Sequence, residues 1–451
     1  MMLGDALAPA ALIQVLENII CSDTYGGAPS QHDERCKSQA VQTELALVRG
    51  FLQMAPVFAG VLCTIPYTLL AGRIGRKPVL VLSGAGMFLS SAWVLAVCYF
   101  RFLPIRWVWL SGAFLFIGGG DPVQSSLAHV IITDVTARPE HAQSFLYLHA
   151  ADVLGGFLGP AISAPMMQSG LVWPVLALAS ITMFLGVFIV AGAIPETLHL
   201  SQGAAAAAAS AVAGEDRDSV LSADLTDAAK PLLGSLLAPL RSALASNPQA
   251  LLLLCIFAPQ TAARELFNSL GLQYSSVKFR LSYAWGNLLL SLFQGAQGLM
   301  ALVLLPFITR VLAAPLGWSP WTRDRRYAIV SIGVMASGLL VIALAPLLVV
   351  EVIGLLLVSL GSCVNGLLMS LMGGVVPADA KGAIYSAALT LSIIARSVSG
   401  PVFSGLFVAG LKLGWAGLGL PFAVMAALLL CEFAAGFFIR TKRAEEDEGD
   451  H

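Results

Sequence analysis

The chain has 451 residues, of which 57% are hydrophobic and only 11% are Asp, Glu, Lys or Arg. About a quarter of the residues of a soluble globular domain are charged, so this composition excludes an ordinary water-facing surface and indicates an integral membrane protein. The formal net charge of −1 gives no indication of nucleic-acid binding.

Apolar segments follow one another along the chain. The bilayer core offers no hydrogen-bond partner to an exposed backbone, so a helix needs about 20 predominantly apolar residues to cross it. Such segments predict six spans, a polar break and six further spans, at residues 3–21, 47–71, 78–99, 106–132, 143–168, 171–194, 249–275, 284–309, 327–347, 350–376, 383–410 and 417–439. We therefore expect an all-α integral membrane protein with about twelve transmembrane helices.

The first span, 3–21, is the least regular. It contains Asp5, Gln14 and Glu17 and begins at the initiating Met with no leader. One interpretation is that the natural chain has a longer N-terminus. A cleaved signal peptide is the alternative interpretation. The stretch has no basic region at its start and carries acidic residues, and both features disfavour a signal peptide.

The polar break divides the chain into parts. We expect an N-terminal six-helix bundle over residues 1–195, a cytoplasmic linker over 196–248, a C-terminal six-helix bundle over 249–440 and a cytoplasmic tail over 441–451. An alanine run and an acidic patch in the linker are typical of a simple tether, with a regulatory segment as the alternative.

The distribution of Lys and Arg predicts the orientation. With the N-terminus inside, 15 of the 25 basic residues fall on the cytoplasmic side and eight fall outside. This excess predicts that both termini are cytoplasmic. We expect a multi-pass protein of the plasma membrane. Cys21 and Cys36 then lie on an outer loop that faces an oxidising compartment, and a disulfide between them is our hypothesis.

The loop between the second and third spans carries a family resemblance. It reads Pro66-Tyr-Thr-Leu-Leu-Ala71-Gly72-Arg73-Ile-Gly75-Arg76-Lys77-Pro78. Its Arg73-x-Gly75-Arg76-Lys77 core resembles the signature loop G-x-L-A-D-R-x-G-R-[KR] of the major facilitator superfamily, and it follows the second span as in that family. Further segments resemble a fungal efflux branch of the family, among them Gly118-Gly-Gly120, Pro195-Glu196-Thr197 and Leu272-Gln273-Tyr274.

The resemblance implies two pseudo-symmetric six-helix bundles around a central cavity that opens alternately to each side. It also implies a monomeric carrier of a small molecule, without cofactor or metal. Two positions depart from the family pattern: Thr68 stands at the usual glycine, and Gly72 replaces the aspartate. Because that acid is associated with locking the outward-facing state, we expect Gly72 to weaken this lock.

Charged residues inside the spans are the candidates for function. A charge near the bilayer centre costs several kcal/mol, so it usually faces a cavity or a partner. We expect cavity or proton-coupling roles for Asp121, Asp152, Arg264 and Arg396, with helix bridging as the alternative for each.

Helical spacing places other polar residues beside these charges. Asn268 shares a face of the seventh span with Arg264, and Gln294 lies on a polar face of the eighth. Glu265 adjoins Arg264, and neighbours on a helix point about 100° apart, so we do not expect these two to pair. Toward span ends lie Glu17, Glu351 and Glu432, for which a structural role is favoured.

The function that these features favour is proton-coupled efflux of a small, largely apolar organic compound. An uptake carrier for a sugar or another nutrient and a solute receptor that does not transport are the alternatives. An enzyme is disfavoured: His129-x4-Asp134 matches the H-x4-D pattern of acyltransferases, but no phosphate-binding block accompanies it. The expected partners are the solute, protons and the lipid bilayer, with no nucleic acid.

Overall fold

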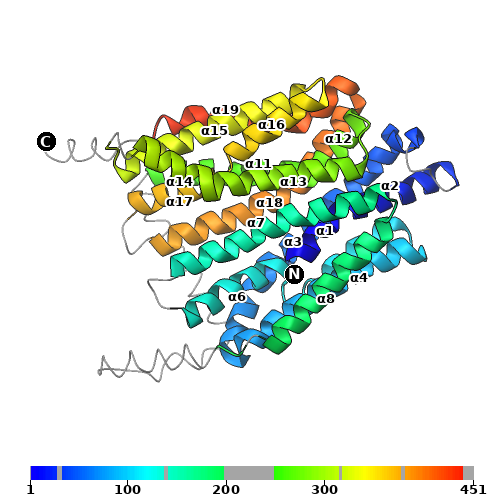
Figure 1. Ribbon diagram of the computed structural model, residues 1–451, viewed down its shortest axis with the longest axis horizontal. Helices are drawn as coiled ribbons and strands as arrows, with labels where there is room; N and C mark the ends of the chain where they lie inside the picture. Colours follow the sequence, from blue (N-terminus) through cyan, green and yellow to red (C-terminus); the bar gives the residue numbers. More distant parts are fainter. Residues whose placement is uncertain are drawn as a thin grey trace.

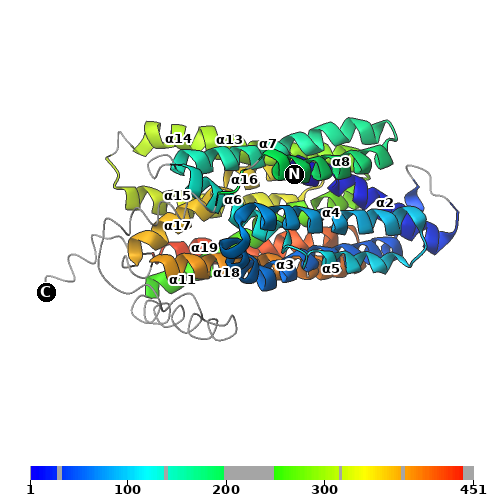
Figure 2. The same cartoon turned by 90° about the horizontal axis from the view of Figure 1, so that it is seen from below.

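The computed structural model describes residues 2–27, 33–136, 141–193, 195–197, 248–313, 317–376 and 381–439. Within these ranges the chain is helical, and the long helices run along one common direction (Figures 1 and 2). The linker expected at 196–248 lies outside the described residues except for its two ends, as does the tail expected at 441–451.

The first half of the protein comprises residues 2–197. Its first span consists of α1 (Met2–Leu7) and α2 (Pro9–Tyr25), which are separated at Ala8, directly before a proline that cannot donate a backbone hydrogen bond. The remaining helices are η1 (Glu34–Lys37), α3 (Gln39–Ile74), α4 (Arg76–Phe100), η2 (Ile105–Leu110), α5 (Ser111–Phe114), α6 (Gly120–Val135), α7 (His141–Gln168) and α8 (Val172–Ala193).

The second half comprises residues 248–439. Its helices are α11 (Pro248–Leu266), the π turn η4 (Phe267–Gly271), α12 (Leu272–Lys278), α13 (Tyr283–Leu299), the π turn η5 (Met300–Leu304), α14 (Leu305–Ile308), the π turn η6 (Thr309–Ala313), α15 (Pro320–Leu344), α16 (Leu348–Leu360), α17 (Val364–Val375), α18 (Lys381–Lys412), η7 (Trp415–Gly419) and α19 (Leu420–Gly436).

The helical segments coincide with the spans predicted from the sequence. Among the described residues, nine stretches are long and apolar enough to cross a membrane by length and composition. The other three predicted spans correspond to Met2–Tyr25, Ile105–Val135 and His141–Gln168. The expected all-helical class with many membrane spans is confirmed.

Not every predicted span is a continuous helix: the first is divided at Ala8, span 350–376 is divided between α16 and α17, and span 106–132 is divided at a run of glycines. Span 106–132 is interrupted between α5 and α6, where Gly118, Gly119 and Gly120 have φ of 81°, 78° and 64°. A Cβ on Gly118 would lie 2.3 Å from the backbone nitrogen of Ser83, on α4. The three glycines therefore permit a left-handed turn and a close approach of backbones that larger residues would prevent.

The two ends of the bundle differ in the loops that they carry. We call the end with Cys21, Cys36 and the 101–104 and 279–282 loops the disulfide end, and the end with Gly75, Glu196 and Ser319 the linker end (right and left in Figure 1). Helix α1 begins near neither end, because Met2 packs against Gly155 at the middle of α7. The side of the membrane on which the N-terminus lies stays a prediction.

Candidate functional site

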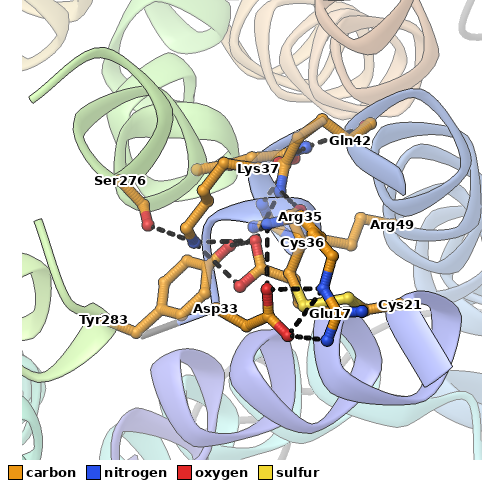
Figure 3. Close-up of polar contacts among 11 residues, drawn as sticks. Glu17, Cys21, Asp33, Arg35, Cys36, Lys37, Gln42, Arg49, Ser276 and Tyr283 are labelled. Carbon is orange, nitrogen blue, oxygen red and sulfur yellow. Dashed lines mark hydrogen bonds and ion pairs between the residues drawn. A yellow bond between two sulfur atoms is a disulfide. The ribbon is translucent and has the colours of Figure 1, made fainter. Parts of the chain in front are cut away.

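A polar network joins the two halves at the disulfide end (Figure 3). We call it the disulfide-end network. From the first half it contains Glu17, Lys37, Gln42 and Arg49, and from the second half Ser269, Gln273, Ser276 and Tyr283.

The Glu17 carboxylate is the centre of this network, and its residue is only 4% exposed. Lys37 Nζ donates to both carboxylate oxygens at 2.8 Å and to Ser276 Oγ at 2.6 Å. The Tyr283 hydroxyl donates to Glu17 Oε1 at 2.9 Å, and Lys37 Nζ lies 4.5 Å from the centre of the Tyr283 ring. Burial lowers the pKa of the Lys37 ammonium, and the neighbouring Glu17 opposes this change.

Two amides and one arginine extend the network along α3 and the seventh span. Gln273 Nε2 donates to the backbone oxygen and to Oε1 of Gln42, at 3.0 and 2.9 Å. Arg49 donates to the Ser269 carbonyl at 2.5 Å and to Gln273 Oε1 at 3.4 Å. Since Gln42 and Gln273 are fully buried and Arg49 is 7% exposed, these bonds hold groups that would be costly to bury alone.

The disulfide between Cys21 and Cys36 connects α2 to η1. Lys37 directly follows Cys36, and the Cys36 carbonyl accepts a hydrogen bond from Gln42 Nε2 at 2.8 Å. The disulfide thereby ties the segment that carries Lys37 to the helix that carries Glu17.

A cavity of about 270 Å³ lies deeper in the bundle and is lined by both halves. Asp5, Asp152 and Gly156 line it from the first half, and Arg264, Asn268 and Gln294 line it from the second. Four of the residues predicted from the sequence thus share one cavity.

Two polar atoms of this cavity lack a partner. Within the described part of the chain, Arg264 Nε and Asn268 Oδ1 are buried and make no hydrogen bond. Asn268 belongs to the π turn Phe267–Gly271, and such turns occur often at functional sites. Buried polar groups are normally satisfied, so these two atoms mark a place beside the cavity where the described residues leave polar groups without their usual bonds.

A second cavity, of about 350 Å³, lies within the first half and is lined by Asp5, Pro56, Ser90 and Asp121, among others. Asp5 lines both cavities and therefore lies between Asp121 and Asp152. The sequence alone does not single out Asp5 as a site residue, because an acid near the end of an apolar segment indicates only an irregular span.

The predicted residues Glu265 and Arg396 do not line the cavity that the two halves share. They form an ion pair of 3.4 Å between α11 and α18, with side chains 33% and 53% exposed. Glu265 thus pairs across helices instead of with its neighbour Arg264. The second half also contains two buried acids bonded within it: Glu351 accepts from Ser275 Oγ at 2.5 Å, and Glu432 accepts from Gln260 Nε2 at 2.5 Å.

The signature loop is anchored at the linker end by Glu196. Its carboxylate accepts from the backbone nitrogens of Arg76 and Lys77 at 2.8 and 3.2 Å and so caps the first turn of α4. Gly75 has φ of 113°, and a Cβ there would lie 2.3 Å from Glu196 Oε2, so only glycine fits. In contrast, a Cβ on the exposed Gly72 would meet nothing within 4 Å, and Arg73 is also exposed.

Comparison with known proteins identifies the family. The sequence model of the Major Facilitator Superfamily matches residues 40–400. The chain belongs to this superfamily. It is therefore a membrane transporter of that family and not an enzyme, as the signature loop predicted.

The relatives of this transporter are fungal. It is 26% identical to the MFS efflux pump atnC of Emericella nidulans, over 99% of this chain and 86% of that protein. It is also 26% identical to the efflux pump ustT of Aspergillus flavus, over 90% and 79%.

Solved structures share the fold of the transporter. The D-xylose-proton symporter matches with a TM-score of 0.62 at 13% identity, over 98% of this chain and 96% of that one. The human organic anion transporter MFSD10 matches with a TM-score of 0.56 at 19% identity, over 96% and 99%. At these identities the likeness concerns the fold alone.

Proposed function

We propose that this transporter exports a small, largely apolar organic compound in exchange for protons. The observation that carries the proposal is the shared cavity, in which Asp5 and Asp152 of one half face Arg264 and Asn268 of the other. The names of the fungal relatives, which are efflux pumps, support the direction of transport.

The orientation follows from the basic residues. The linker end faces the cytoplasm, where residues 196–248 and both termini are expected, and the disulfide end faces the outside of the plasma membrane. In this orientation the disulfide-end network joins the two halves on the outer side of the membrane. A tag in residues 198–247 is then expected to be inaccessible in intact cells, and labelling from outside would contradict this.

The transport cycle requires the network to open and the cavity to change its charge. Turning outward separates Lys37 from Ser276 and Tyr283 from Glu17, because each of these bonds crosses between the halves. A carboxylate in a cavity takes up a proton when burial favours its neutral form and releases it when a nearby arginine favours the anion. We assign this role to Asp152 or Asp121, with Asp5 beside both.

The proposal is tested first in cells that express the gene and in cells from which it has been deleted. We expect the medium of the expressing cells to contain a small apolar compound that the deletion strain retains. The compound found is then used with purified protein in proteoliposomes, where an imposed pH gradient is expected to drive its accumulation. An identical set of compounds in both media would contradict export, and accumulation that does not depend on the pH gradient would contradict proton coupling.

We expect the purified transporter to be a monomer in detergent solution.

A further inference from the structure

An apolar groove of about 750 Å³ opens beside α15 at the linker end, away from both cavities described above. Helix α15 contributes Ile329, Val330 and Val334; α19 contributes Phe433, and Phe437 directly follows that helix. The opposite wall comes from Met300, Leu304, Leu305 and Ile308. Helices α15 and α19 lie on the side of the second half that is turned away from the first half (Figure 1), so the groove faces the bilayer.

One mouth of the groove is positively charged. Arg325, Arg326 and Tyr327 line it from the beginning of α15, and Trp318 lines it from just before that helix. The guanidinium of Arg326 stacks on the Trp318 ring at 4.4 Å, and the residue is exposed. Arg325 donates to the Phe437 carbonyl at 3.1 Å, while its Nε is buried without a partner among the described residues.

The nearest acid does not neutralise this mouth. Asp324 is 5% exposed and accepts from Arg323 Nε at 2.8 Å and from Ser370 Oγ at 2.6 Å. Its charge is therefore already balanced by Arg323, and no ion pair of Arg325 or Arg326 occurs in the described ranges. The two guanidiniums leave a local positive charge at the N-terminal end of α15, where the helix dipole also favours an anion.

The dimensions of the groove fit one membrane leaflet. From Arg326 to Val334 the helix rises by about 12 Å, since each residue adds 1.5 Å. One leaflet of the hydrocarbon core is about 15 Å thick. An apolar channel of this length below a pair of arginines and an aromatic residue matches an acyl chain below a charged headgroup.

We propose that this groove binds one anionic phospholipid, with its phosphate at Arg325 and Arg326 and an acyl chain along Val330 and Val334. The proposed orientation places the site in the cytoplasmic leaflet, where anionic lipids are concentrated. The site is separate from the solute cavity, so its occupation does not depend on the identity of the transported compound or on proton coupling.

The test measures lipid binding to the purified full chain in detergent by native mass spectrometry. Phosphatidylserine and phosphatidylcholine with the same acyl chains are titrated separately, and we expect one phosphatidylserine to bind more tightly than phosphatidylcholine. The variant Arg326→Gln is expected to lower this preference about fivefold, because one basic residue near the surface contributes about 1 kcal/mol. Val330→Trp fills the groove at a side chain that is 60% exposed, and it is expected to remove the bound phosphatidylserine.

Arg73→Gln serves as the matched control, because it removes one exposed positive charge at the same end of the other half. It is expected to leave the preference for phosphatidylserine unchanged. Equal binding of the two lipids to the unaltered chain would overturn the proposal and leave only an ordinary lipid shell. Equal losses in Arg326→Gln and Arg73→Gln would also overturn it, because the charge effect would then not belong to the groove.

Discussion

The disulfide-end network and the shared cavity contain the same kinds of charged and polar side chains. These side chains bond to one another in the network, whereas several in the cavity are exposed or lack a partner among the described residues. In the network, Glu17 accepts from Lys37, Gln42 and Tyr283 and is almost fully buried. In the cavity, Asp152 is exposed, and Arg264 Nε and Asn268 Oδ1 have no partner in the part of the chain that the structure describes.

This difference separates two tasks that polar groups perform in a transporter. Groups that bond to each other across the halves stabilise one conformation, since a hydrogen bond to a charged group contributes about 1.5–3 kcal/mol. A carboxylate that is exposed in the cavity, such as Asp152, is available to a solute or a proton and adds little to the stability of the empty state. The account therefore predicts that variants in the network change the conformation, whereas variants in the cavity change transport.

The largest conformational effect is expected from Lys37→Ala. Removing one partner of a buried ion pair costs about 3–5 kcal/mol, because the other charge remains buried alone. We expect a lower melting temperature and longer distances across the disulfide end, measured between spin labels on the two halves. Lys412→Ala removes an exposed cation at the same end and should change neither quantity. Identical behaviour of the two variants would show that Lys37 does not hold the halves together.

A somewhat smaller effect is expected from loss of the disulfide. Closing a loop of about 15 residues stabilises a folded chain by about 3 kcal/mol in the chain-entropy description. The double variant Cys21→Ser/Cys36→Ser should melt at a lower temperature than the unaltered chain and should not respond to a reductant. Mass spectrometry that finds both thiols free in protein from the native membrane would contradict the disulfide.

The smallest conformational effect is expected at the linker end, from Gly72→Asp. The open space around Gly72 accommodates the side chain, and the restored acid should favour the outward-facing state. Conformational coupling of this kind typically amounts to about 1–3 kcal/mol. Gly72→Asn has the same size without the charge, so a shift seen equally in both variants, or in neither, would remove the electrostatic explanation.

The sequence predicted the spans because each depends on a local run of apolar residues. It also indicated part of the shared cavity, since Asp152, Arg264, Asn268 and Gln294 stand out as polar residues within apolar helices. Their side chains must avoid lipid and therefore turn toward one another.

The disulfide-end network could not be predicted in the same way. Its bonds join residues as distant as Glu17 and Tyr283, and their pairing depends on how the helices of two halves are positioned. Because Glu17 lies near the end of a span, the sequence favours a structural role for it but does not reveal its partners. The break at Gly118–Gly120 likewise depends on the close approach of α4, which a single helix does not reveal.

The central claim is that a carboxylate of the cavities carries the coupled proton. It is tested most directly by accumulation of the exported compound in proteoliposomes under an imposed pH gradient, with energy-independent exchange measured beside it. We expect Asp152→Asn or Asp121→Asn to abolish accumulation and to retain exchange, because the cavity stays formed while its proton site is lost. Asp23→Asn, the same change at an exposed residue of the disulfide end, should retain both activities. Accumulation that persists in both the Asp121 and Asp152 variants would contradict the claim and move the proton site to another acid, with Asp5, which lines both cavities, the first to examine.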